Sequence, residues 1–197
     1  MRKFLRAAAV AALLSLALLA DLVGPAMAQL FPPAPTVAAP YAVATPKTIR
    51  VTAAQTVTAS SAYSSGNVVG GKITFANAVR VAAQGGIVQS AVLRDKAGQN
   101  VSYDLFLFDA DPSATTVTDK AAVALNTADL GKGVGVVQFS GVALGAASTM
   151  GISTASGQGL AFKLGSGSSL YAILVTRGTP TYASTSDVSV DLIILPD

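Results

Sequence analysis

KTIRVTAAQTVTA, residues 47–59, alternates between apolar and polar side chains along most of its length. The apolar positions of one face are Ile49, Val51, Ala53 and Val57. The opposite face carries Thr48, Arg50, Thr52, Thr56 and Thr58. Because successive side chains of a strand point to opposite faces, this alternation predicts a β-strand with one buried and one solvated face. Strands of that kind are typical of antiparallel sheets.

The chain beyond this first strand repeats the pattern, with segments closed by Gly, Asn, Asp or Ser. Seven further strands are expected, at residues 67–75, 86–95, 101–110, 134–142, 159–165, 169–177 and 187–196. Short strands separated by turn residues are typical of sandwiches and barrels. The sequence therefore predicts an all-β domain over residues 47–197, an antiparallel β-sandwich of jelly-roll type with about eight strands.

Three segments of this domain depart from simple alternation. Gly70 and Gly71 interrupt the strand at 67–75, which indicates a β-bulge or a close approach of backbone. Residues 101–110 are apolar on both faces at their centre, which places them inside the sandwich. Residues 111–133 break the strand rhythm and are expected to form a loop with one short helix, KAAVAL, capped at its N-terminus by Asp119.

The first 46 residues have a different composition. Three basic residues lie at positions 2, 3 and 6, an apolar run covers residues 7–20, and Ala26-Met27-Ala28 follows. This order is typical of a secretory signal peptide over residues 1–28, cleaved after Ala28. The run is shorter than the roughly 20 apolar residues of a membrane span. An uncleaved helix that packs on a partner or a membrane is the alternative. Residues 29–46 hold five prolines and are expected to form an extended linker.

The charge balance argues against a nucleic-acid partner. The chain of 197 residues has 13 basic and 10 acidic residues, but residues 1–28 hold three of the basic residues and one acid. Ten basic and nine acidic residues remain, scattered singly, with no basic stripe for phosphates. Charged residues are only 12% of the chain, which suits a weakly charged surface that packs against other subunits.

Most catalytic chemistry is excluded by missing residue types. The chain has no Cys, His or Trp, and all of its acids are Asp. Zinc sites of Cys or His and Ser-His or Cys-His catalysis are therefore impossible. Neither S-x-x-K nor G-x-S-x-G occurs, and no phosphate-binding glycine motif is complete. Paired aspartates could serve a glycosidase, but few aromatic residues are present to stack on sugars. We expect no enzymatic activity, no catalytic residue and no cofactor.

The densest group of acidic residues lies in DADPSATTVTD, residues 109–119. Asp109, Asp111 and Asp119 are weak calcium candidates, because hard cations take several oxygen ligands and a D-x-D spacing can supply two from one loop. The segment lacks the glycine and the terminal glutamate of a calcium-binding loop. Asx turns and a helix cap are the alternative roles for these residues.

Three long stretches carry a family resemblance. GNVVGGKITF, GGIVQSAVLRDKAGQNVSYDLFLFDADPSATTVTDKAA and VTRGTPTYASTSDVSVDLIILPD resemble a family of small jelly-roll-like structural proteins of tailed phages and prophages, associated with the head or its decoration. The likeness covers roughly residues 60–197 and includes no catalytic residue. It implies a domain that binds other protein subunits, either virion proteins or copies of itself. The signal-like segment departs from this pattern, because virions assemble without export.

Two functions follow as expectations. The first is a non-enzymatic virion structural protein of capsid-decoration type, which forms a homo-oligomer and binds neither nucleic acid nor membrane. The alternative is an exported β-sandwich module, periplasmic or extracellular, that binds a cell-surface glycan or protein. Cleavage after Ala28 favours the second, and an intact N-terminus in a particle favours the first.

Overall fold

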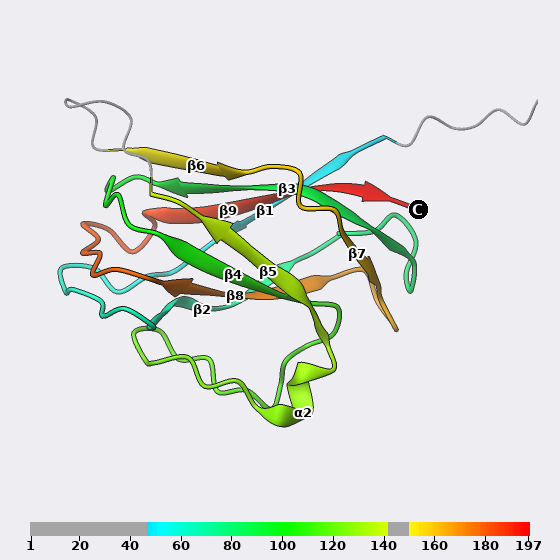
Figure 1. Cartoon of the computed structure of the whole chain (residues 1–197), viewed down its shortest axis with the longest axis horizontal. Coiled ribbons are helices and arrows are strands. Elements are labelled where there is room, and N and C mark those ends of the chain that lie inside the picture. Colours follow the sequence, from blue (N-terminus) through cyan, green and yellow to red (C-terminus); the bar gives the residue numbers. More distant parts are fainter. Residues whose placement is uncertain (1–46, 142–149) are drawn as a thin grey trace, which may run out of the picture. The chain divides into compact units, whose positions relative to one another are not determined.

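The computed structural model describes residues 47–141 and 150–197 (Figure 1). The signal-like segment and the proline-rich linker lie outside these residues, so both stay predictions. The described residues form nine strands and one short helix. The strands are β1 (Ile49–Ala54), β2 (Val68–Phe75), β3 (Gly85–Asp95), β4 (Tyr103–Phe108), β5 (Gly133–Phe139), β6 (Gly151–Ala155), β7 (Leu160–Lys163), β8 (Leu170–Thr176) and β9 (Val188–Pro196). The helix is α2 (Thr127–Leu130).

The strands form two antiparallel sheets, which Figure 1 shows one above the other. One sheet has the order β1-β9-β3-β6, with β7 also paired to β3, and the other has the order β2-β8-β4-β5. β6 and β7 pair with opposite ends of β3 in the same direction, so they are one strand interrupted between Ala155 and Leu160. Counted in this way, the eight strands follow the orders 1-8-3-6 and 2-7-4-5, which is the jelly-roll topology. The predicted fold class is confirmed.

The sandwich core lies between the two sheets and follows the predicted alternation. In β1, Val51 and Ala53 are buried while Arg50 and Thr52 are exposed. β9 contributes inward side chains at alternate positions, among them Leu192 and Ile194, which are fully buried. Removing these apolar side chains from water is the main source of stability for such a domain.

A second apolar cluster covers the outer face of the sheet β2-β8-β4-β5. It consists of Val68, Phe108, Ile173 and Val175, against which side chains of the β4–β5 connection pack. That connection carries α2 and lies below the second sheet in Figure 1. β4 is therefore buried on both faces, as the apolar pattern of residues 101–110 predicts. The other sheet has no such cover among the described residues.

Two local predictions were wrong. Residues 120–125 do not form a helix: Ala122 and Ala124 lie in extended bridges to Asn67 and Thr116, and α2 begins after Asn126, whose side chain accepts a hydrogen bond from the Ala128 N–H. Tertiary pairing outweighs the helical pattern of KAAVAL. Strand β6 was not predicted, since GISTA contains a single large apolar side chain and its inward positions are small. No helix among the described residues has the length and hydropathy of a membrane span.

Candidate interaction surfaces

The buried carboxylates of the described residues are all engaged by nearby donors. Asp95 accepts hydrogen bonds from the backbone N–H groups of Ala97 and Gln99, at 2.9 Å each. Asp187 likewise accepts hydrogen bonds from the backbone N–H groups of Ala183 and Ser184, at 2.9 and 2.8 Å. The remaining buried carboxylates meet cations: Asp104 meets Arg177, Asp129 meets Lys132, and Asp191 meets Arg50 and Arg94. Carboxylates held by turn amides and ion pairs serve the structure, including Asp104, which lines a groove of about 370 Å³ together with its partner Arg177.

Asp119 is the most heavily bonded of the three calcium candidates. Its carboxylate accepts hydrogen bonds from the Thr58 N–H at 2.9 Å and hydroxyl at 2.6 Å, from the Tyr63 hydroxyl at 2.8 Å, and from the Gly70 N–H at 2.7 Å. Burial raises the pKa of Asp119, but these hydrogen bonds outweigh it and leave the pKa below its usual value. The residue thus ties the β4–β5 connection to the chain between β1 and β2.

The other two candidates lie in different surroundings. Asp111 forms an ion pair with Lys72 at 2.8 Å, with both side chains partly exposed. Asp109 is half-buried in a groove of about 420 Å³ that Lys163 also lines. Within residues 47–141 and 150–197, no three acidic side chains are grouped so that they could hold a metal ion. The structure does not bring Asp109, Asp111 and Asp119 together as a ligand set.

Three buried tyrosines form a connected group, which meets Asp119 through the Tyr63 hydroxyl. The Tyr63 and Tyr182 rings meet edge to face, with centroids 5.4 Å apart, and the Tyr103 and Tyr182 hydroxyls are 2.9 Å apart. Burial and the hydrogen bond to Asp119 raise the pKa of Tyr63 to about 12, and burial also raises the pKa of Tyr103. All three therefore stay neutral at physiological pH. They act as packed hydrogen-bonding groups, not as proton-transfer groups.

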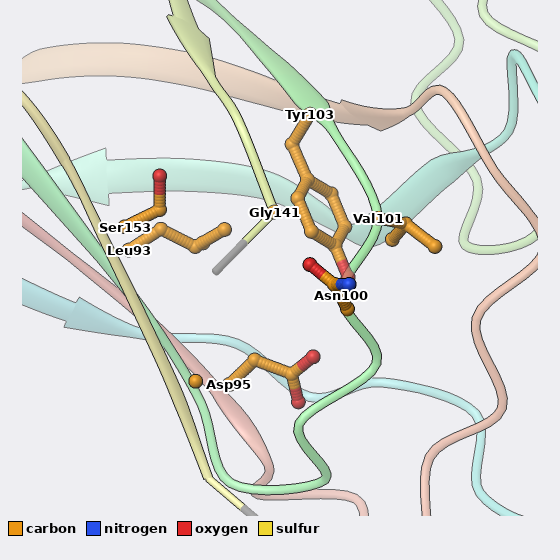
Figure 2. A pocket seen from close by; sticks show the side chains of 8 residues that line it. Leu93, Asp95, Asn100, Val101, Tyr103, Gly141 and Ser153 are labelled. Carbon is orange, nitrogen blue, oxygen red and sulfur yellow. The ribbon is translucent and has the colours of Figure 1, made fainter. Parts of the chain in front are cut away.

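A small enclosed cavity lies between β3, β4 and β6 (Figure 2). Leu93, Tyr103 and Ser153 line it, with Asp95 at its lower side in Figure 2. Its internal volume is about 20 Å³, which is enough for a single water molecule. Burial raises the pKa of Asp95 here, but the turn amides already engage this carboxylate. A cavity of this size has no room for an organic substrate.

The uncovered face of the sheet β1-β9-β3-β6, here called the open face, is mixed in character. Ile87 and Ile152 are exposed on it, by 39% and 41%. At its centre Asp191 is fully buried, with its Oδ2 atom contacted by Arg50 Nε at 2.7 Å and by Arg94 Nη1 at 2.5 Å. The Oδ1 atom of Asp191 has no hydrogen-bond partner among the described residues. This face therefore carries exposed apolar side chains together with a cluster that has one excess positive charge.

Sequence reasoning missed this arginine cluster. Arg50, Arg94 and Asp191 come from three different strands, and they meet only because β9 lies between β1 and β3 in one particular register. The signal present in the sequence is Asp191 itself, an acid inside the apolar run DVSVDLIILP. A charge within such a strand indicates a cross-strand partner, but it does not say which one.

We expect Asp191→Asn to lower the free energy of unfolding by about 1–2 kcal/mol, because it leaves two guanidinium groups without their counter-charge. The loss of stability is smaller than for a wholly buried ion pair, because the arginine side chains are 54% and 35% exposed and their guanidinium groups can be hydrated instead. Urea unfolding of the variant, with Arg50→Met and Arg94→Met measured beside it, tests this. Each arginine variant should lose less than Asp191→Asn, since the other guanidinium remains. An unchanged midpoint for Asp191→Asn would contradict the assignment.

Comparison with known proteins adds no relative. No protein-family model matches the chain, and no curated protein or solved structure is significantly similar to it. The functional argument therefore rests on the residues and geometry of this chain.

Proposed function

We propose that this protein is a non-enzymatic structural protein of a tailed-phage or prophage particle, and that it acts by binding other protein subunits. The observation that carries the proposal is that all five buried carboxylates of the described residues are engaged by turn amides, hydroxyls or cations. Carboxylates held in this way support a structural role, in which the domain acts through surfaces that bind other molecules.

Two further features support a role in protein contacts. The open face is uncovered by the described residues and carries exposed isoleucines, whereas the outer face of the other sheet is buried by the chain's own β4–β5 connection. The sequence stretches that resemble phage structural proteins span much of this jelly-roll domain, from β2 to β9. Charged residues are only 12% of the chain, and the buried centres of protein interfaces are depleted in charge.

The test is the protein content of particles purified by density gradient from the strain that carries the gene. We expect the chain to band with the particles in many copies, quantified by mass spectrometry against the major capsid subunit. A host cytoplasmic protein of similar abundance is the control for trapping. Absence of the chain from banded particles would overturn the proposal.

The exported binding module is the second candidate, and the signal-like order of residues 1–28 favours it. Its distinguishing measurement is the N-terminus of the mature protein. A chain that starts at Gln29 and is recovered from the periplasm or the medium supports this candidate. A chain that keeps residues 1–28 and is recovered in particles contradicts it.

A further inference from the structure

Strand β5 lies at the edge of its sheet with one side unpaired. It pairs with β4 from Tyr103 opposite Phe139 to Phe108 opposite Gly133. Within the described residues, its backbone forms no hydrogen bond to any other segment. A row of N–H and C=O groups on its other side is therefore available to a further strand.

The other sheet edges carry a charge, a bulge or an interruption along their length, whereas β5 has a bulge only at its start, between Gly133 and Gly135. Natural sheets protect their edges with charged side chains, prolines, bulges or interruptions. β1 carries Arg50, and β2 carries Lys72 beside a bulge. The β6–β7 edge is interrupted after Ala155 and ends at Lys163. β5 reads GVGVVQF, without a charge or a proline, and pairs regularly with β4 from Gly135 to Phe139.

An apolar surface lies beside this edge on the outer side of the sheet. Val136 is 41% exposed, and Leu130, at the end of α2, is 58% exposed. Between them lies a groove of about 300 Å³ lined mainly by apolar side chains, among them Phe106 and Leu125. A strand added to β5 would direct alternate side chains over this groove and cover it. The unpaired edge and the groove thus lie side by side, both formed in part by β5.

We propose that β5 pairs antiparallel with β5 of a second copy of the chain, so that two four-stranded sheets become one continuous sheet. An antiparallel pair of identical strands has a twofold axis, so each copy presents the same surface to the other. The neutral sequence of β5 makes this possible, because self-pairing sets no like charges opposite each other. Val136 of each copy then lies close to the partner's β5, and both apolar grooves are covered. The inference rests on the proposed function, since it names one contact through which a structural subunit would act.

The test is the mass of the full chain in solution, measured by light scattering over a range of concentrations. We expect a dimer for the wild type. Val136→Lys should weaken the dimer about tenfold or more in Kd, because it places an ammonium group close to the twofold axis and removes apolar contact. Val81→Lys is the matched control, since Val81 is an exposed valine in the connection between β2 and β3, outside both β5 and the open face. That variant should remain dimeric.

Amide hydrogen exchange locates the contact independently of any variant. In the dimer, β5 amides that point away from β4 should exchange slowly, and dilution should speed their exchange while leaving β9 unchanged. A wild type that is monomeric at every concentration, or a dimer that survives Val136→Lys undiminished, would overturn the pairing. Particle association is measured separately, so a monomer that still bands with particles refutes the pairing and leaves the proposed function standing.

Discussion

Asp119→Ala is expected to lower the free energy of unfolding by about 3 kcal/mol. The Asp119 carboxylate accepts hydrogen bonds from Thr58, Tyr63 and Gly70, and without it the Gly70 N–H and the buried Tyr63 hydroxyl lose their acceptor. Hydrogen bonds to a charged group contribute about 1.5–3 kcal/mol each, and a buried donor left without a partner costs about 1–3 kcal/mol. The effects are not additive, which holds the total near the stated value. Urea unfolding followed by circular dichroism measures it.

Asp111→Ala is the matched control, because it removes a carboxylate from the same connection. Asp111 meets Lys72 in an ion pair whose side chains are 41% and 38% exposed, and exposed pairs contribute about 0–1 kcal/mol. If both variants lost the same small amount, Asp119 would be no more than another surface acid. A large loss for Asp119→Ala alone identifies it as the anchor of the β4–β5 connection.

The pH dependence of Asp119→Asn provides a second readout of the same bonds. Because the folded pKa of Asp119 lies below its ordinary value of 3.8, its stabilising contribution is fully present above that value and is lost as the pH falls through the folded pKa. The stability difference between the wild type and Asp119→Asn should therefore be largest near neutral pH and shrink in acid, below about pH 4. A difference that stays constant through this range would contradict the assigned pKa shift.

The fold could be predicted from the sequence because its strands carry their own burial pattern. Residues 47–59 alternate as they do because one side of β1 faces the core, and residues 101–110 are apolar throughout because β4 is covered on both sides. The bulge at Gly70 and Gly71 was also predictable, since paired glycines inside a strand have few other uses. Because burial in the folded domain follows these local sequence patterns, eight of the nine strands could be identified.

The contacts of the candidate surfaces could not be predicted, because they join residues that are far apart in the chain. Asp119 lies 61 residues from Thr58 and 49 from Gly70, so its local sequence suggested a helix cap or a cation ligand instead. The cluster at Asp191 depends on strand register, and the exposure of β5 depends on its being the last strand of its sheet. The order and register in which the strands pair determine these contacts and exposures, and a short stretch of sequence does not reveal that order.

Gly70→Ala is expected to cost about 2–4 kcal/mol, for two separate reasons. Gly70 has φ = +77°, where a side chain costs about 1–2 kcal/mol. A Cβ atom there would also lie 2.7 Å from Cβ of the buried Gln55, and overpacking of this kind costs about 1–3 kcal/mol. Because Gln55 Cβ is fixed to its backbone, it cannot swing aside, so β2 and the chain after β1 must separate. Urea unfolding measures the loss.

Gly71→Ala separates the two reasons. Gly71 also has a positive φ, of +84°, but a Cβ atom added there would lie 3.8 Å from its nearest neighbour, the Val117 carbonyl oxygen. This variant carries the backbone strain without the overlap and should lose about 1–2 kcal/mol. Equal losses at the two glycines would show that strain alone requires them. A larger loss at Gly70 shows that the bulge also serves close packing against Gln55. The separation of β2 from Gln55 in Gly70→Ala would also lengthen the hydrogen bond from the Gly70 N–H to Asp119. The bulge and the Asp119 anchor would then be one structural unit, so Gly70→Ala combined with Asp119→Ala should cost less than the sum of the single losses.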